Sequence, residues 1–193
     1  MEYTTEAIKQ RISDHLLRYF AVDAENATDE QLYKATALVI RNILLRRKQD
    51  NNKKLIASGR KRVYYLCMEF LIGRQMRNNL FSLGLEDNFR AAIKQLSSVS
   101  LDQLYELGFD AGPGNGGLVR LAACCMDRLV ALNYPAMGFS IRYDYGFFRQ
   151  QIVENEQVEL PELWLDSGEA WMMQRADKQF EVKFGGNVEQ VWE

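Results

Sequence analysis

The sequence predicts an α/β fold, and three observations support this. A run of aromatic and aliphatic residues at 63–69 is typical of a buried strand, and a second run covers 134–143. Segments with helical periodicity lie between them, and the last of these begins at a glycine-rich turn, 112–117. Strand, helices, glycine turn, helix and strand in this order favour a sheet whose strands are joined by right-handed crossovers.

Two amphipathic helices are expected at the start of the chain. Apolar residues recur every four positions over 5–20 and mark one helix face: Ile8, Ile12, Leu16 and Phe20. A second helix opens at Thr28, because Thr28 and Gln31 have the spacing of a capping box. The core-facing residues expected on this helix are Leu32, Ala35, Val39 and Ile43.

A basic run follows on the second helix. Between Arg41 and Arg62 there are nine lysines and arginines against one acid, Asp50. Such a run is usually a solvated helix face. The alternative is a binding surface for a phosphorylated effector or for the acidic surface of a partner.

A carboxylate, Glu69, closes the first predicted strand. A lone carboxylate at the carboxyl end of a strand often points into a ligand crevice. The alternative is a salt bridge with Arg74 or Arg62. Helical periodicity then predicts three helices: 71–83, 87–96 and 101–107.

The glycine-rich turn leads into the most apolar helix of the chain, 118–132. We expect Asn115 as its N-cap, which places Gly116 and Gly117 in the first turn, where free N–H groups and the positive end of the helix dipole converge. Without a Cβ these residues let an anion approach the backbone, so the turn suits a phosphate. The helix is apolar on nearly every face, so we expect it to be buried and to end at a left-handed Asn133.

General nucleotide-binding motifs fit this turn poorly. Gly112, Gly114 and Gly117 match the dinucleotide fingerprint, but the preceding segment predicts a helix where that motif needs a strand. Leu118 stands where a P-loop has lysine. A glycine-rich helix start packed tightly under a sheet is the alternative to a phosphate site.

Two β-hairpins are predicted in the last third of the chain. Strands at 147–153 and 157–160 flank the turn Glu154-Asn155-Glu156. Further on, a clean alternation of apolar and charged residues at 180–184 predicts a strand whose partner begins at 188. Two tryptophans between the hairpins are expected to anchor the packing: Trp164 and Trp171.

The composition indicates an ordinary globular protein. The formal net charge is −2 and hydrophobic residues make up 47%, so nothing favours nucleic acid or membranes as partners. The first residues lack a targeting pattern, and no run approaches the roughly 18 apolar residues of a membrane span. Cys67, Cys124 and Cys125 lack metal-ligand spacing, which favours reduced thiols in the cytoplasm and no metal site. His15, the single histidine, is expected on a helix face.

Three blocks of the sequence resemble the glycogen/maltodextrin phosphorylases, the pyridoxal-phosphate-dependent α-glucan phosphorylases. The blocks are RVYYLCMEFLIGR at 62–74, GNGGLVRLAACCMD at 114–127 and YPAMGFSIRYDYGFFRQQIV at 134–153. The resemblance runs from about Asp23 to the end of the sequence. It implies the opening part of the Rossmann-like N-terminal domain of a two-domain, GT-B type glycosyltransferase, with N-terminal helices and a C-terminal β-hairpin region.

The resemblance also implies roles for individual residues. In that family the glycine turn faces the catalytic cleft, and its backbone N–H groups meet the phosphate of substrate and cofactor. This role falls on Gly116 and Gly117, with Leu118 beside the sugar. Glu69 and Asn115 are expected to line the same cleft, and no metal ligand is expected.

Two positions depart from the usual family pattern. Pro113 stands where leucine is common, and Val119 stands where glycine is common. The resemblance divides the single partial domain into a helical, dimer-contact segment at 1–60 and a sheet portion with the phosphate turn at 61–193. Ile56 stands where some relatives have a tyrosine that stacks on a nucleotide effector, so we expect no such switch.

The implied function is α-glucan phosphorolysis. Phosphorylases of this family cleave a terminal α-1,4-linked glucose with phosphate and release glucose 1-phosphate. Their pyridoxal phosphate is attached to a lysine of the second domain, and nothing in these 193 residues corresponds to it. The 193 residues alone are therefore expected to be inactive. The alternatives are a non-catalytic module that pairs with itself or with a full-length phosphorylase, and a truncated remnant.

Overall fold

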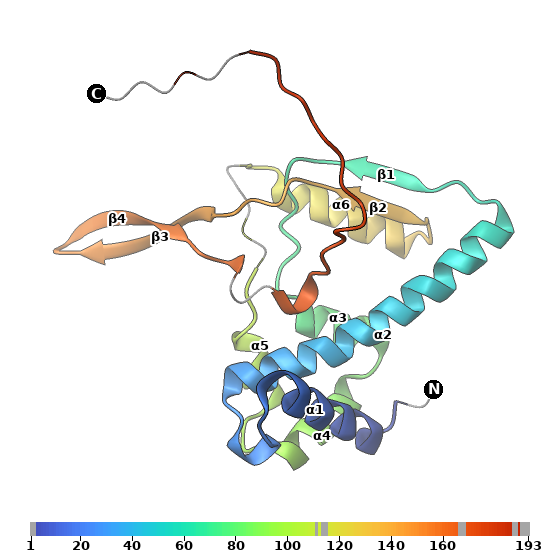
Figure 1. Cartoon of the computed structure of the whole chain (residues 1–193), viewed down its shortest axis with the longest axis vertical. Helices are drawn as coiled ribbons and strands as arrows, with labels where there is room; N and C mark the ends of the chain where they lie inside the picture. Colours follow the sequence, from blue (N-terminus) through green and yellow to red (C-terminus); the bar gives the residue numbers. More distant parts are fainter. Residues whose placement is uncertain (1–2, 111, 113–115, 166–168, 187–188, 190–193) are drawn as a thin grey trace.

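A long helix connects a group of helices to a small α/β unit (Figure 1). The computed structural model describes residues 3–110, 112, 116–165, 169–186 and 189. The elements are α1 (Thr5–Phe20), η1 (Ala24–Asn26), α2 (Asp29–Ser58), β1 (Val63–Leu66), α3 (Gln75–Leu83), α4 (Glu86–Leu96), α5 (Leu101–Glu106), α6 (Val119–Ala131), β2 (Ala136–Phe139), β3 (Gly146–Val153), β4 (Glu156–Glu162) and η2 (Glu169–Trp171). The combination of helices with small sheets agrees with the predicted mixed α/β class.

The predicted capping box at Thr28 is confirmed. The Thr28 hydroxyl accepts a hydrogen bond from the Gln31 N–H at 3.3 Å, and the Gln31 side chain accepts one from the Thr28 N–H at 2.9 Å. These bonds satisfy two of the backbone donors at the start of α2 that would otherwise lack partners. The helix then continues for 30 residues and ends at Gly59, whose φ is +62°. At that φ a side chain would be strained, so glycine suits this helix end.

The hydrophobic core lies among the helices and not beneath a sheet. The predicted faces of α1 and α2 are buried in it, and α3, α4 and α5 contribute the remaining apolar side chains. Phe89 of α4 is its largest fully buried residue. The other large side chains with less than 2% exposure are Ile8, Ile12, Leu16, Leu32, Val39, Ile40, Met76, Leu80, Ile93, Leu101 and Leu104.

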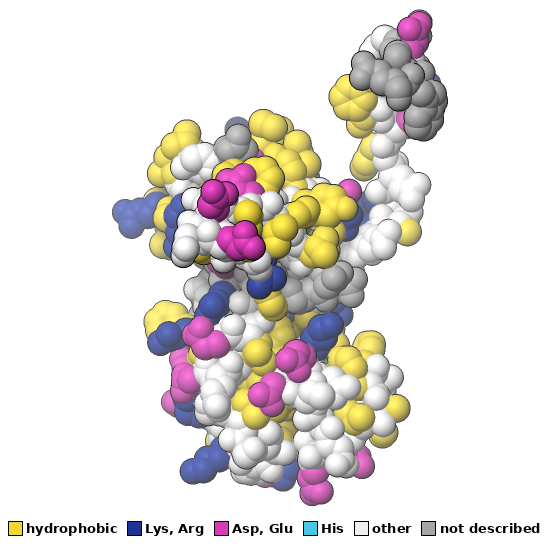
Figure 2. Space-filling model, turned by 90° about the vertical axis from the view of Figure 1, so that its left-hand side faces the viewer, with side chains coloured by type: hydrophobic (Ala, Val, Ile, Leu, Met, Phe, Trp, Pro, Cys, Tyr) yellow, Lys and Arg dark blue, Asp and Glu magenta, His cyan; other side chains and the backbone are white. Residues whose placement is uncertain are grey.

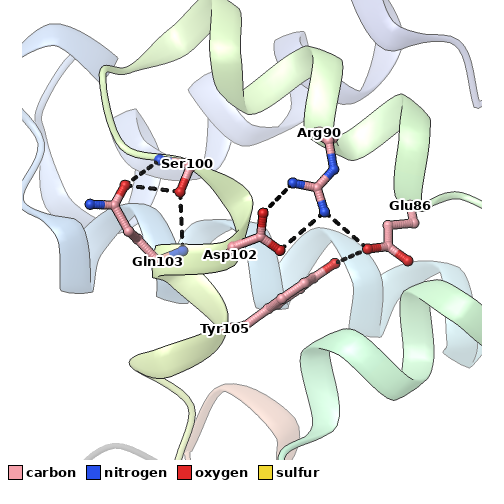
Figure 3. A network of polar contacts seen from close by, with 6 residues as sticks. All are labelled: Glu86, Arg90, Ser100, Asp102, Gln103 and Tyr105. Carbon is pink, nitrogen blue, oxygen red and sulfur yellow. Dashed lines mark hydrogen bonds and ion pairs between the residues drawn. The ribbon is translucent and has the colours of Figure 1, made fainter.

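A polar network ties α4 to α5 at the edge of this core (Figure 3). Arg90 of α4 binds both carboxylate oxygens of Asp102 at the start of α5. The same guanidinium binds Glu86 at 3.1 Å, and the Tyr105 hydroxyl donates to Glu86 at 3.2 Å. Burial, together with the charge of Glu86, raises the pKa of Tyr105. The network therefore orients the two short helices without burying a charge deeply.

The strands form two separate pairs. β1 and β2 pair in parallel, with Val63 opposite Ala136 and Leu66 opposite Phe139, and α6 packs against β2. β3 and β4 form an antiparallel hairpin, which confirms the first predicted hairpin. Its turn residues, Glu154 and Asn155, have φ values of +52° and +66°. Two successive positive φ values match the right-handed twist of the flanking strands.

Helix α6 is less buried than its sequence predicted. Only Ala122 and Ala123 are buried, whereas Leu121 and Val130 are 57% and 68% exposed. The prediction of a helix buried on every face was wrong, because a pair of strands covers only one side of it. Figure 2, viewed from the side toward which the hairpin points, shows hydrophobic side chains gathered on the upper part of the molecule.

The second predicted hairpin is not formed in the described part of the chain. Residues 180–184 have no strand structure, and Phe180 and Phe184 are 88% and 90% exposed. An alternating pattern produces a strand only where a neighbouring strand accepts its hydrogen bonds, and most of the expected partner, 188–192, lies outside the described residues. Trp164 is buried and Trp171 packs against the core, as expected of anchors. No described helix is both long and apolar enough to span a membrane.

Candidate functional site

A cleft of about 620 Å³ lies at the carboxyl ends of the two parallel strands. The chain forms it from the residues after β1, the glycine turn with the start of α6, and the start of β3. Ligands of parallel α/β sheets bind at this end of the strands. The lining residues are Cys67, Met68, Glu69, Gly116, Leu118, Val119, Tyr143, Gly146, Phe147 and Phe148.

Glu69 is the buried charged group of this cleft, with 8% exposure. Its carboxylate accepts a hydrogen bond from the Gly116 N–H at 3.0 Å and another from the Tyr143 hydroxyl at 3.1 Å. Desolvation, reinforced by the bond to Glu69 and by its charge, raises the pKa of Tyr143. The two arginines considered as partners of Glu69 bind elsewhere, Arg74 to Glu106 at 2.6 Å and Arg62 to Asn52 at 2.7 Å.

Close packing explains some glycines of the turn and not others. At Gly116 an added Cβ would lie 2.7 Å from Cγ1 of Val119 and 2.9 Å from Oε2 of Glu69. At Gly112 it would collide with the Trp164 ring. At Gly117 it would meet nothing within 4 Å. The sequence left two alternatives for this turn, close packing and an approach for a phosphate. In the structure Gly116 is closely packed and the neighbouring Gly117 is open.

The structure brings some of the predicted site residues together. Glu69 and Gly116 are joined by a hydrogen bond, and Leu118 lines the same cleft while 71% exposed. Gly117 lies between them in the sequence, next to open space. Asn115 lies outside the described residues, as does Pro113.

The start of α6 differs from its predicted position. The helix begins at Val119 with Leu118 as N-cap, and no side chain caps it. The prediction of Asn115 as N-cap was therefore wrong, and Gly116 and Gly117 precede the helix instead of forming its first turn. Glycine is a poor helix former, and the hydrogen bond from its N–H to Glu69 holds Gly116 ahead of the helix.

Tyr143 is a site residue that the sequence analysis missed. It follows β2 as Glu69 follows β1, and the two side chains meet because parallel strands end at one edge. Phe147 and Phe148 were assigned to a hairpin and not to the cleft that they line. A polar or aromatic residue shortly after each parallel strand is the signal that would have identified this group.

The carboxylate of Glu69 limits where an anion can bind in this cleft. Gly117 is open to an approaching phosphate, whereas the Gly116 N–H already binds a carboxylate oxygen. A phosphate about 4 Å from that carboxylate would be repelled by about 4 kcal/mol per pair of unit charges at an effective dielectric constant of about 20. The described lining contains no lysine that would form a Schiff base. Within the described ranges no cluster of His, Cys, Asp or Glu has the arrangement of a metal site.

Comparisons with known proteins relate the chain to one family. Residues 94–193 match the family model described as carbohydrate phosphorylase. The chain is 40% identical over 187 residues to the glycogen phosphorylase of Haemophilus influenzae. This match covers 97% of this chain and 23% of that protein. It is 40% identical over 185 residues to the glycogen phosphorylase of Chlamydia pneumoniae, a match that covers 96% of this chain and 22% of that protein. It is 37% identical over 184 residues to the glycogen phosphorylase of Bacillus subtilis, and this match covers 93% of this chain and 23% of that protein. The chain thus spans less than a quarter of the length of these curated relatives.

Proposed function

The chain belongs to the carbohydrate phosphorylase family, and we propose that its cleft is one wall of the active site of an α-1,4-glucan phosphorylase. Such an enzyme cleaves the terminal glucose with inorganic phosphate and releases glucose 1-phosphate. The supporting observation is the hydrogen bond of 3.0 Å between the Gly116 N–H and the Glu69 carboxylate. This bond shows that the backbone of the glycine turn presents a donor to an anionic oxygen inside the cleft.

The two sides of the cleft suit different parts of the reactants. Gly117 stands between the lining residues Gly116 and Leu118 and meets open space, so its backbone N–H receives the phosphate. Glu69 and Tyr143 carry a buried acceptor and a hydroxyl, so they bind sugar hydroxyl groups. Leu118 and Phe147 provide apolar surface for the sugar ring. Keeping the phosphate on the Gly117 side limits its repulsion by Glu69.

The 193 residues alone are proposed to be inactive. Leu118 is 71% exposed and Phe148 54% exposed, so water reaches the cleft freely. An open cleft neither excludes water nor holds two reactants in line. Pyridoxal phosphate, when bound, supplies a second phosphate group for acid–base chemistry. The described lining of the cleft contains no lysine to hold it, so the contribution of these lining residues is confined to binding and orientation.

Three further features belong to the same proposal. The chain forms the opening part of a Rossmann-like domain of GT-B type, in which β1 and β2 are neighbouring parallel strands. Helix α2 and the loop before it contribute to a dimer contact, as the resemblance implies. The enzyme works in the cytoplasm, where cysteines such as Cys67, Cys124 and Cys125 stay reduced.

A chimeric enzyme tests this proposal. The aligned first part of the Haemophilus influenzae glycogen phosphorylase is replaced by this chain, and glucose 1-phosphate formation from maltodextrin and phosphate is measured with pyridoxal phosphate present. We expect turnover by the chimera and none by the isolated chain. Gly117→Ala should raise the KM for phosphate about tenfold, because its methyl group occupies the approach to the backbone N–H.

A second glycine substitution provides the matched control. Gly185 also has nothing within 4 Å of an added Cβ, and it lies outside the cleft. Gly185→Ala should leave the KM for phosphate unchanged. A folded chimera that contains the cofactor and is inactive would contradict the proposal, as would equal effects of the two substitutions.

An association module is the second candidate function. Apolar side chains of the strands are exposed, including Leu66 at 78% and Ile152 at 80%. Exposed apolar surface and unpaired strand edges favour association with another protein. Co-purification of the chain with a full-length phosphorylase would support this candidate, and a strictly monomeric chain without such association would exclude it.

A further inference from the structure

Two surfaces of opposite charge lie on opposite sides of the molecule. The β3–β4 hairpin extends to one side, and the second half of α2 extends to the other (Figure 1). From 150 to 162 the hairpin has four glutamates and no lysine or arginine. From 47 to 54 helix α2 has four lysines and arginines and one acid, Asp50. The separation of the two segments prevents their charges from neutralising each other within one copy.

One face of the hairpin combines negative charge with an exposed aliphatic side chain. Ile152 is 80% exposed. Glu159 pairs with Gln150, which is two positions from Ile152, so strand alternation places Glu159 on the same face as Ile152. Arg149 is one position from Gln150 and lies on the opposite face. Glu154 is exposed in the adjacent turn. We call Ile152, Glu154 and Glu159 the hairpin face.

The second half of α2 carries the same pattern with positive charge. Ile56 is 81% exposed. Lys53 precedes it by three positions, so the two side chains share one side of the helix. Lys54 is exposed next to them. We call Lys53, Lys54 and Ile56 the helix face.

The charged groups of both faces lack counter-charges within the chain. Among the described residues, none of Lys53, Lys54, Glu154 and Glu159 takes part in an ion pair. An apolar centre surrounded by a charged rim is the usual arrangement of a protein–protein contact. Rims of opposite sign also accelerate association and fix the orientation of the partners. The two faces are therefore complementary to each other.

We propose that two copies of this chain associate through these faces, so that the hairpin face of each copy binds the helix face of the other. The aliphatic side chains meet at the centre, and the glutamates of one copy face the lysines of its partner. Because the faces lie on opposite sides of the molecule, an antiparallel pair makes the contact twice and forms a closed dimer. A single contact of this kind is small, and its repetition enlarges the interface.

This inference deepens the second candidate function by naming the partner and the contact of the association module. It does not depend on the proposed phosphorylase activity, because no residue of either face lines the cleft. It also does not use the loop before α2. An inactive chimera would therefore leave the inference standing, and a monomeric chain would leave the proposed activity standing.

Sedimentation velocity of the 193-residue chain over a series of concentrations tests the inference. We expect a reversible equilibrium between monomer and dimer with a dissociation constant in the micromolar range. Raising sodium chloride from about 0.1 M to about 1 M should weaken the dimer at least about threefold, because the Debye length falls from about 10 Å to about 3 Å.

Two charge-reversed variants identify the contact. The hairpin variant carries Glu154→Lys with Glu159→Lys, and the helix variant carries Lys53→Glu with Lys54→Glu. Each variant alone should associate with itself at least about tenfold more weakly than the original chain, because like charges then meet at both contacts. An equimolar mixture should regain the original affinity within about threefold, since each hairpin face again meets a helix face of opposite charge.

A matched control separates this contact from an effect of net charge. Asp127→Lys with Glu181→Lys changes the net charge as much as the hairpin variant does, at exposed positions outside both faces. This control should change the affinity by less than about twofold, and circular dichroism verifies that all variants are folded. A monomeric original chain, a dimer that persists in either charge-reversed variant, or a mixture no tighter than the single variants would overturn the inference.

Discussion

Replacing Gly116 with alanine should destabilise the protein through two specific contacts. The new Cβ would lie 2.7 Å from Cγ1 of Val119 and 2.9 Å from Oε2 of Glu69, both closer than Cβ atoms normally approach. Val119 is β-branched and is the first residue of α6, so its χ1 has little freedom to move the methyl group away. Glu69 is held in place by Tyr143. Relief therefore requires a shift of the turn.

The size of the effect follows from what such a shift breaks. Overpacking costs about 1–3 kcal/mol, and loss of a hydrogen bond to a charged group costs about 1.5–3 kcal/mol. A shift of the turn relieves part of the overpacking but weakens the hydrogen bond to Glu69. We therefore expect the free energy of unfolding to fall by about 2–3 kcal/mol in total. This corresponds to a decrease of about 1 M in the urea midpoint.

Urea unfolding of a small set of variants measures this loss. Gly117→Ala should be neutral or stabilise by about 0.4–1 kcal/mol, since its Cβ meets nothing and its conformation suits alanine. Adding Val119→Ala to Gly116→Ala should recover about 1 kcal/mol by removing the methyl group that collides. A loss below about 0.5 kcal/mol for Gly116→Ala, or no coupling between the two substitutions, would refute the reasoning.

Three further predictions concern the helical part of the chain. Phe89→Ala should lower the free energy of unfolding in urea by about 3–5 kcal/mol, because Phe89 is 0% exposed. Phe81 is 77% exposed, so Phe81→Ala should lower it by less than about 0.5 kcal/mol. Equal losses for the two variants would contradict the assigned core. The hydrogen bond from Arg90 lowers the pKa of Asp102, so the Arg90–Asp102 pair stabilises the fold above the unfolded pKa of 3.8 and loses this effect as the pH falls through the folded pKa. Asp102→Asn should therefore flatten the acid unfolding curve followed by circular dichroism. An unchanged acid transition would argue against this role of the pair. Burial lowers the pKa of His15 below 6.5, so the stability of the fold should decrease as the pH drops below that value. His15→Gln should abolish this pH dependence of stability between about pH 7 and pH 5. A pH dependence that persists in the variant would exclude His15 as its source.

The helices could be predicted from sequence because their signals are local. The bounds of α1 match the predicted range, and the capping box of α2 depends on two residues three positions apart. A second capping box, formed by Ser100 and Gln103 at the start of α5, has the same spacing and was not identified. It was visible in the sequence by the same rule.

The site could be predicted only in part because its geometry depends on distant residues. Glu69 lies 47 positions before Gly116 and 74 before Tyr143, and both are its hydrogen-bond partners. The predicted helix start at Asn115 was too early because it took no account of Glu69, which holds Gly116 ahead of the helix. The burial of α6 likewise depends on how many strands lie beside it, which its own apolar residues do not reveal.

The pairing of β1 with β2 has a consequence for how the chain folds. Val63 pairs with Ala136, which is 73 positions later, whereas the helices α1 to α5, which contribute most of the core, all end before residue 107. At synthesis rates of about 5–20 residues per second, β1 leaves the ribosome roughly 4–15 s before its partner strand exists. Helix formation and loop closure are complete within microseconds, so the helices assemble first. During those seconds Tyr64 and Leu66 stay exposed on a strand that has no partner. In this interval the nascent chain is most prone to aggregation or to binding by a chaperone.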